Sequence, residues 1–124
     1  IIENRLYFIS KWLRQLYILD LDGNTYTNHT TTQGLFDGAP DQILHILGQR
    51  KDKENVLYFT EEGGRRPGIH GRNELGQFFT ILESDVYDPD ETTGFAFSPD
   101  NMHLYVCYQL NGVCFDVTRK DGLP

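Results

Sequence analysis

Residues 91–117, ETTGFAFSPDNMHLYVCYQLNGVCFDV, decide how this chain is expected to fold. Aromatic and β-branched residues dominate the stretch, and turn residues interrupt it at two places. The first interruption is SPDN at 98–101, in which Pro99 suits the second position of a type I turn. The second is Asn111-Gly112, a dipeptide that favours the type I′ turn of a β-hairpin. The sequence therefore predicts three short antiparallel strands joined by two tight turns.

A turn centred on Asn111-Gly112 also sorts the side chains of this hairpin onto two faces. Such a period-two separation indicates an antiparallel sheet with one strongly buried face. One face is expected to carry Leu104, Val106, Tyr108, Leu110, Val113, Phe115 and Val117, and the other Tyr105, Cys107, Gln109, Cys114, Asp116 and Thr118.

The same register bears on the two cysteines. It sets Cys107 opposite Asp116 and Cys114 opposite Gln109, so the thiols lie on a diagonal, about 7 Å apart at Cβ. That separation is too large for a disulfide. We therefore expect free thiols, and a bridge would place the turn one residue earlier, at Leu110-Asn111.

The hairpin belongs to a pattern that recurs along the chain. RLYFIS, VLYFTE and HLYVCY each place Leu-Tyr before an apolar residue, and their leucines recur about every fifty residues. Each segment is followed by a second strand-like segment, respectively LYILDL, GIHGR and GVCFDV. Periods of this length, built from several short strands, are typical of β-propeller blades. The leucines concerned are Leu6, Leu57 and Leu104.

We therefore predict an all-β domain of antiparallel sheets that form about two to three propeller-type blades. The blade-like units lie near 1–47, 56–84 and 91–122. The segment PDQILHILGQ at 40–49 fits either a short helix or a strand, and we favour the strand because its neighbours are all β. The charged run at 48–55 is expected to be a solvated loop. Closed propellers usually have four or more blades, so this chain is expected to be a section of one.

The composition is that of a folded, acidic domain. The 124 residues are 39% hydrophobic and 13% aromatic, which is enough to fill a core. The net charge of −7 argues against a nucleic-acid surface, where a basic patch is expected. No apolar run is long enough to span a bilayer, so we expect no transmembrane segment.

Four segments resemble the C-terminal blades of the PhoX-like family of β-propeller proteins, and in particular an algal branch of it. They are LYILDLDGNTY at 16–26, GLFDGAPDQI at 34–43, LYFTEEGGRRPGIHGRN at 57–73 and ETTGFAFSPDNMHLYVCYQ at 91–109. The resemblance implies a propeller fold. It also implies a calcium-dependent alkaline phosphatase, in which acidic side chains from several blades hold calcium and iron around a phosphate. Many relatives have no established activity.

Acidic residues near two predicted strand ends are candidate calcium ligands. Glu61 and Glu62 precede Gly63-Gly64, and Glu91 opens the segment ETTG after the acidic stretch 85–90. Calcium prefers several oxygen ligands, and flexible glycines help to arrange them. The alternatives are a charged turn for Glu61 and Glu62 and a solvated loop for the acids near Glu91.

Basic residues in RRPGIHGR at 65–72 form a candidate anion or partner contact. Arg65, Arg66, His70 and Arg72 fall within eight residues of an otherwise acidic chain. Guanidinium groups bind phosphate or carboxylate in a bidentate manner, and a strand here would place His70 and Arg72 on one face. The alternative is that the arginines pair with nearby acids or with a partner protein.

Two functions follow from these features. The first is a non-catalytic interaction or accessory module whose open strand edges are covered by other protein chains, because no complete catalytic motif is present. The algal resemblance suggests a plastid or photosystem complex as the assembly, with the chain peripheral to the membrane. The second is a fragment of a calcium-dependent phosphomonoesterase, in which Glu61, Glu62 or Glu91 helps to hold calcium and His70 or Arg72 steers the phosphate.

Overall fold

The computed structural model describes residues 4–32, 35–46, 55–86 and 90–122, and these residues form three antiparallel sheets without a helix. Among them, therefore, no helix is long and apolar enough to cross a membrane. The first sheet has the order β1 (Arg5–Ser10), β2 (Gln15–Asp20), β3 (Thr25–Thr30). The central sheet has the order β4 (Ala39–Ile46), β5 (Val56–Glu62), β6 (Gly68–Arg72), β7 (Phe78–Glu83). The last sheet contains β8 (Thr92–Phe97), β9 (His103–Tyr108) and β10 (Val113–Thr118), with β9 in the middle.

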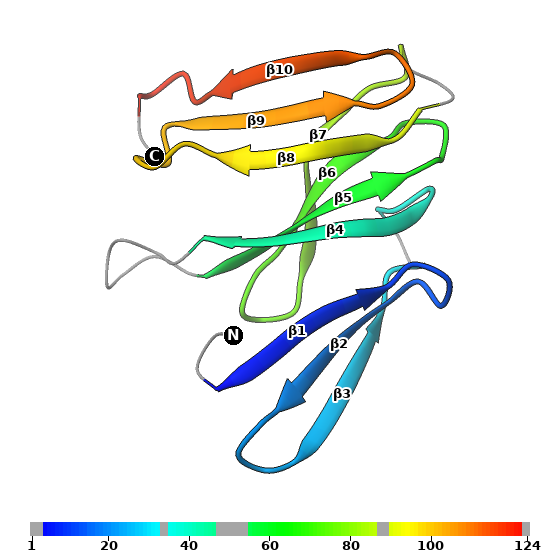
Figure 1. Ribbon diagram of the computed structural model, residues 1–124, viewed down its shortest axis with the longest axis vertical. Coiled ribbons are helices and arrows are strands. Elements are labelled where there is room, and N and C mark those ends of the chain that lie inside the picture. Colours follow the sequence, from blue (N-terminus) through cyan, green and yellow to red (C-terminus); the bar gives the residue numbers. More distant parts are fainter. Residues whose placement is uncertain (1–3, 33–34, 47–54, 87–89, 123–124) are drawn as a thin grey trace.

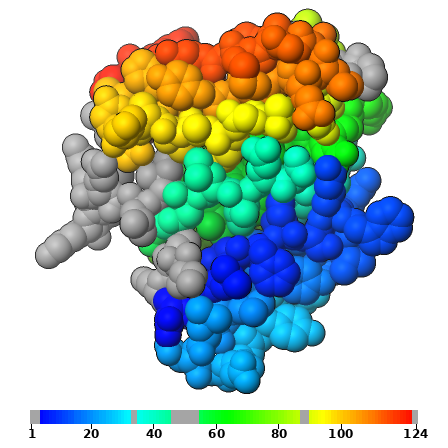
Figure 2. All heavy atoms as spheres, viewed as in Figure 1, coloured from blue at the N-terminus to red at the C-terminus, as the bar shows by residue number. Residues whose placement is uncertain are grey.

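The three sheets follow one another in space as they do in sequence, with the central sheet between the other two (Figure 1). Figure 2 shows the first sheet, in blue, and the last sheet, in yellow to red, at opposite ends of the molecule. The prediction of an all-β fold is confirmed. The choice of a strand for the segment that begins at Pro40 is also confirmed, because β4 runs from Ala39 to Ile46. Most of the predicted loop at 48–55 lies outside the described residues.

The main apolar core lies between the first and central sheets. Leu16 from β2 and Phe59 from β5 are fully buried there, together with Leu57 and Phe36. Phe36 meets Phe59 edge to face, with 6.1 Å between the ring centroids. Partly buried side chains from both sheets complete this core, namely Tyr7, Ile9, Ile18, Ile43 and Phe78.

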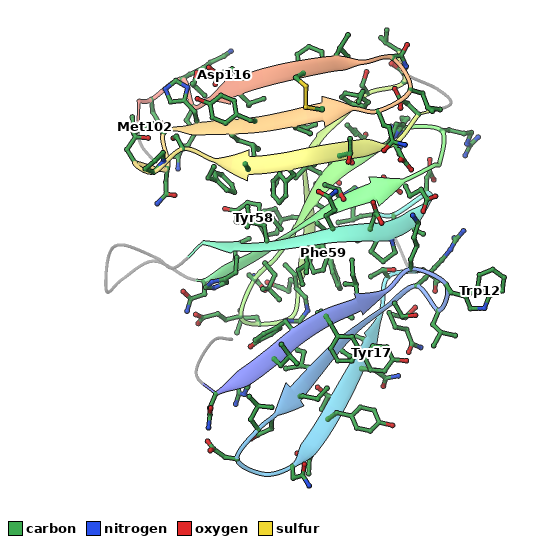
Figure 3. The ribbon with its side chains drawn as sticks, in the orientation of Figure 1. Trp12, Tyr17, Tyr58, Phe59, Met102 and Asp116 are labelled. Carbon is green, nitrogen blue, oxygen red and sulfur yellow. A yellow bond between two sulfur atoms is a disulfide. The ribbon has the colours of Figure 1, made fainter. Side chains whose placement is uncertain are left out.

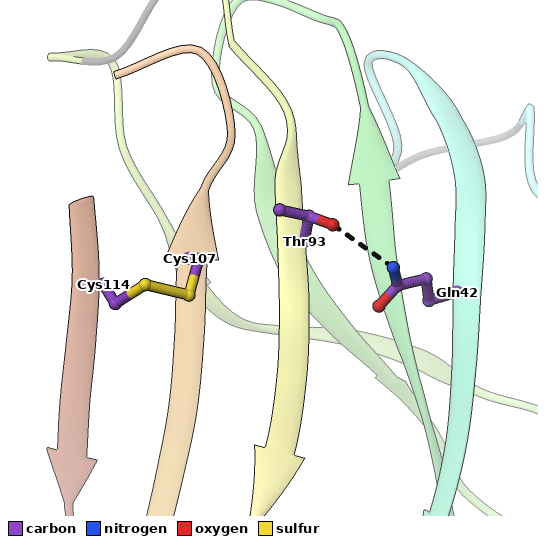
Figure 4. Close-up of a disulfide and its surroundings, with 4 residues drawn as sticks. All are labelled: Gln42, Thr93, Cys107 and Cys114. Carbon is purple, nitrogen blue, oxygen red and sulfur yellow. Dashed lines mark hydrogen bonds between the residues drawn. A yellow bond between two sulfur atoms is a disulfide. The ribbon is translucent and has the colours of Figure 1, made fainter. Parts of the chain in front are cut away.

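The C-terminal hairpin corrects the sequence prediction on the cysteines. Cys107 and Cys114 are directly opposite each other in β9 and β10 and form a disulfide, with a Cα separation of 4.0 Å (Figure 4). Tyr108 faces Val113, so the loop holds four residues rather than two. A type I′ turn needs positive φ at both Asn111 and Gly112, whereas here only Gly112 has it, at 64°. The expectation of free thiols was wrong because the turn is centred one residue earlier than Asn111-Gly112.

The predicted face assignment of this hairpin survives that correction. A turn moved by one residue shifts the strand pairing by two, and a shift of two leaves each side chain on its original face. On the predicted buried face, Leu104, Val106 and Tyr108 of β9 are buried, whereas Leu110 in the loop and Phe115 in β10 are 69% and 40% exposed. On the other face, Tyr105 is 41% exposed. Phe97 of β8, which pairs with Leu104, contacts Tyr58 of β5, so the buried face points toward the central sheet.

Bulges occur at corresponding places in β4 and β8, the first strands of their sheets. In β4 the register against β5 shifts between Pro40 and Ile43, and in β8 the register against β9 shifts between Thr93 and Ala96. Each shift inserts one extra residue into the first strand, which bends and twists it. The two bulges are also linked, because the side-chain amide of Gln42 donates a hydrogen bond to the Thr93 hydroxyl at 3.2 Å (Figure 4).

Candidate functional site

Glu61 is the centre of a buried polar network that joins the central and last sheets. It lies near the end of β5 and is fully buried. One carboxylate oxygen accepts a hydrogen bond from the Gly38 amide at 2.5 Å, and the other accepts from the Gly68 amide at 3.2 Å. The second oxygen also lies 3.0 Å from Nε2 of His70. The carboxylate therefore has three donors, which compensates for its removal from water.

His70 is the partner that fixes the orientation of this carboxylate. The ring is fully buried in β6, and Phe36 lies against it with 4.3 Å between the ring centroids. Because an ionised carboxylate only accepts, Nε2 of His70 carries the proton that points at Glu61. Nδ1 lies 3.2 Å from the Thr80 hydroxyl of β7. Both ring nitrogens of His70 are thus occupied within the fold.

Thr92 extends the network into the last sheet. Its hydroxyl accepts a hydrogen bond from the Glu61 amide at 2.8 Å and donates to the Gly68 carbonyl at 2.7 Å. The backbone of Gly38 lies so close to β5 that only glycine fits there, because a Cβ would lie 2.2 Å from the Glu62 carbonyl oxygen. We call Glu61, His70, Thr92, Gly38 and Gly68 the Glu61 network.

The three predicted calcium ligands are only partly brought together. Glu62 and Glu91 pair as antiparallel bridge partners, so they are neighbours despite their distance in sequence. Glu62 also forms an ion pair with Lys11, whereas the carboxylate of Glu61 is occupied inside the Glu61 network. Among the described residues, no group of three His, Cys, Asp or Glu side chains is arranged to hold a metal ion. The assignment of calcium to these residues stays a prediction.

The four predicted anion contacts separate into different surroundings. Arg65 is exposed, and Arg66 forms an ion pair with Glu83 at 2.9 Å. His70 and Arg72 do lie on one face of β6, because they pair with Phe59 and Leu57 at alternate positions of β5. Of these four residues, Arg72 lines the cavity described next.

The cavity beside Arg72 lies between the first and central sheets and has a volume of about 440 Å³. Arg72 is only 8% exposed, and its Nε has no hydrogen-bond partner. Burial lowers the pKa of Arg72, and the phenol of Tyr7 partly offsets this effect. Nε2 of His45 is also buried without a partner, and burial lowers the pKa of this imidazole. We call this space the Arg72 cavity; its other lining residues include Tyr7, Ile18, Asp20 and Glu74.

A second buried carboxylate, Asp90, anchors the hairpin loop of the last sheet. Its oxygens accept hydrogen bonds from the amides of Leu110 and Asn111 at 2.7 and 3.1 Å, and from the Glu91 amide at 2.7 Å. Burial by itself would raise the pKa of Asp90, but these hydrogen bonds and one from the Asn111 side chain lower it.

Sequence reasoning missed Thr92, Gly38 and His45 as site residues, and it considered Asp90 only as one of the acids of the stretch 85–90, where a solvated loop was the alternative. Thr92, Gly38 and Asp90 act through partners far away in sequence, so no local motif marks their roles. A weak signal was present for His45, because alternation along β4 places it on the same face as Ile43, which packs against the core.

Comparisons of this chain with protein-family models, with curated proteins and with solved structures gave no match in any of the three.

Proposed function

We propose that this chain is a section of a β-propeller that acts as a non-catalytic interaction module within a larger assembly. The arrangement of the sheets supports blade-like units, because β1 contacts β4 in the same way that β5 contacts β8. On this view β1, β5 and β9 are equivalent strands. β4 and β8 are then the equivalent first strands of their units, with corresponding bulges. The Leu-Tyr pairs of the sequence then occupy equivalent positions, one in each unit.

The Leu57-Tyr58 pair of the central sheet carries the proposal, because Leu57 packs in the core shared with the first sheet and Tyr58 contacts Phe97 of the last sheet. Leu57 is 6% exposed and faces the first sheet, and Leu104 is 7% exposed and faces the central sheet. The leucine therefore points toward the preceding unit. Leu6 occupies the same position in the first sheet, points away from the central sheet and is 38% exposed. The outer face of the first sheet thus corresponds to a surface that is buried in the other two units.

Aromatic side chains cover part of this outer face, next to the polar residues Ser10, Gln15, Asn28 and Thr30. Phe8 stacks on Tyr17 with 5.1 Å between the ring centroids, and Tyr17 contacts Tyr26 at 6.2 Å. Trp12 projects from the turn between β1 and β2 and is 95% exposed (Figure 3). Exposed apolar patches of this kind mark interaction surfaces. We call the outer face of the first sheet, formed by Leu6, Phe8, Tyr17, Leu19 and Tyr26, the aromatic face.

We propose that the aromatic face is covered by another protein surface, either a preceding sheet of the same polypeptide or a partner chain. The resemblance to an algal branch of the PhoX-like family suggests a plastid complex, such as a photosystem, as the setting. Neighbouring chains would also cover the unpaired edge of β3, which offers backbone donors and acceptors.

Site-specific photocrosslinking in the source cells tests this proposal. A photoreactive residue at Tyr26, on the aromatic face, is expected to give crosslinks to a protein surface. The matched control is the same residue at Asn111, an exposed position on the hairpin loop at the other end of the molecule. If neither position crosslinks and the purified chain is a monomer that binds no apolar dye, the proposal is rejected.

A second candidate function is a metal-dependent phosphomonoesterase of the PhoX-like type. The bridge between Glu62 and Glu91 favours it, because it sets two predicted calcium ligands side by side at the end of β5. The test is hydrolysis of a chromogenic phosphate ester by the full-length protein, with and without calcium and iron. Metal-dependent turnover that is lost in Glu62→Gln and Glu91→Gln would favour this function over the first. Absence of turnover would end it.

A further inference from the structure

Arg72 is a buried cation for which the described part of the chain offers no counter-ion. Its guanidinium lies 5.8 Å from the centre of the Phe78 ring, and no described carboxylate forms an ion pair with it. The Nε atom is buried and makes no hydrogen bond. Burying a charge without a partner is costly, so native proteins normally supply one.

The two acids that line the Arg72 cavity are already engaged elsewhere. Asp20 accepts hydrogen bonds from the amides of Asp22 and Gly23 at 3.0 and 2.9 Å. Glu74 accepts from the backbone amide and the side chain of Asn55, at 3.1 and 2.7 Å. Neither acid forms an ion pair with Arg72, although both line the same cavity, as does a second cation, Arg5.

His45 adds a second donor on the same wall. His45 in β4 and Arg72 in β6 both pair with Leu57 in β5, so the two side chains stand in one row on one face of the central sheet. Their backbones are two strand spacings apart, about 10 Å. Nε2 of His45 is buried without a partner, as is Nε of Arg72. Both residues line the Arg72 cavity, with Tyr7 on the opposite sheet, although the two unpartnered nitrogens themselves have almost no accessible surface.

We propose that the Arg72 cavity is a binding site for a small molecule that carries an oxyanion, a phosphate or a carboxylate, which the guanidinium of Arg72 holds. Guanidinium groups bind both oxyanions through two parallel hydrogen bonds, and a neutral imidazole can donate a third. The volume of about 440 Å³ lies within the range of small-molecule pockets. The ring of Tyr7 and the side chain of Ile18 provide an apolar wall for the rest of the ligand.

This site is separate from the predicted calcium residues. Arg72 pairs with Leu57 near the start of β5, whereas Glu62 is the last residue of that strand. Leu57 and Glu62 are five positions apart along the extended strand, which corresponds to about 17 Å. The inference therefore does not depend on the proposed docking function or on phosphatase activity.

The test is a titration of the full chain with inorganic phosphate and, separately, with acetate, followed by the NMR signal of the Arg72 Nε proton. We expect a saturable shift with at least one of the two anions, and the tighter one identifies a phosphate or a carboxylate ligand. Chloride at equal ionic strength is expected to give no saturable shift. A signal that moves with neither anion overturns the proposal, and this readout needs no substitution.

Variants then assign the site. Arg72→Met is expected to raise the dissociation constant at least about tenfold, and Arg72→Lys less, because lysine keeps the charge but not the planar fork. Arg66→Met is the matched control, since Arg66 belongs to the same segment but is exposed and paired with Glu83. Unchanged affinity in Arg72→Met, or an equal loss in Arg66→Met, would show that the binding is not located in the Arg72 cavity.

Discussion

The central sheet is joined to its two neighbours by contacts of opposite character. The first junction, between the first and central sheets, is an apolar core around Leu16 and Phe59 with the Arg72 cavity beside it. The second junction, between the central and last sheets, holds the Glu61 network and a hydrogen bond from the Tyr108 hydroxyl to the Pro67 carbonyl at 3.1 Å. Apolar contacts tolerate small shifts, whereas buried hydrogen bonds require one geometry.

This difference indicates where each junction can support function. The first junction has room for a ligand, because a cavity lies within it. The second has its polar groups paired with one another, because the Thr92 hydroxyl of the last sheet accepts from the Glu61 backbone amide and donates to the Gly68 carbonyl of the central sheet. We therefore expect the second junction to hold the sheets in register and the first to accommodate binding.

Removal of Glu61 should give the largest effect. Glu61→Ala leaves three buried donors without an acceptor, and we expect a loss of about 3–5 kcal/mol in the free energy of unfolding. The measurement is urea unfolding followed by circular dichroism. The matched control is Asp116→Ala, which breaks a His-carboxylate pair of 2.8 Å that is exposed, and should lose less than about 1 kcal/mol. Equal losses in the two variants would contradict the structural role of the Glu61 carboxylate, whose partners Gly38, Gly68 and His70 belong to the central sheet and the loop before it.

Truncation of a core side chain at the first junction should lower the free energy of unfolding by less than the loss of Glu61 does. Leu16 is fully buried in β2, and Leu16→Ala should lower the free energy of unfolding by about 3 kcal/mol through lost burial and a new cavity. Leu19→Ala, three residues along β2 and on the aromatic face, is the control and should cost about 1 kcal/mol or less in the isolated chain. A cost at Leu19 as large as that at Leu16 would mean that the aromatic face is already covered.

Reduction of the disulfide should affect only the last sheet. The bond between Cys107 and Cys114 closes a short loop, and loop-closure entropy gives about 2 kcal/mol of stabilisation. We expect that loss on treatment with a reductant, measured by urea unfolding. A Cys107→Ala/Cys114→Ala variant should not respond to the reductant. Mass spectrometry that finds two free thiols in the untreated protein would refute the bond itself.

The smallest effect should come from Asp90, and it should depend on pH. Asp90→Asn removes a buried acceptor from the hairpin loop, so we expect a loss of about 1–2 kcal/mol at neutral pH. The pKa of Asp90 is lowered in the folded state, so its stabilising effect is present above the unfolded pKa of about 3.9 and is lost as the pH falls through the folded value. Unfolding curves of the two proteins should therefore converge as the pH falls through the lowered pKa of Asp90. A constant difference at all pH values would contradict this assignment.

The sequence predicted the strands and their faces well because both depend on local patterns. Alternation along β9 and β10 identified the buried side of the hairpin even though the pairing was wrong by two positions. The error arose because Asn-Gly favours a two-residue turn, whereas the loop here has four residues. The direct pairing of Cys107 with Cys114 reveals it.

The candidate sites could be predicted only in part, because they are made of long-range contacts. Glu61 was predicted as a calcium ligand or as part of a charged turn, whereas its actual partners Gly38 and His70 are set by the pairing of distant segments. Arg72 was one of four basic residues predicted as an anion or partner contact. Its lack of a partner becomes visible only when the first sheet packs against the central one.

The bulges in β4 and β8 have a consequence for aggregation. Both strands lie at the edge of their sheets, and an edge strand is a template for the stacking that builds amyloid fibrils. An extra residue breaks the regular spacing of backbone groups along each edge, so a straight foreign strand cannot pair along its full length. The pairing of β2 with β3 has no such interruption, which leaves β3 as a regular edge for strand addition.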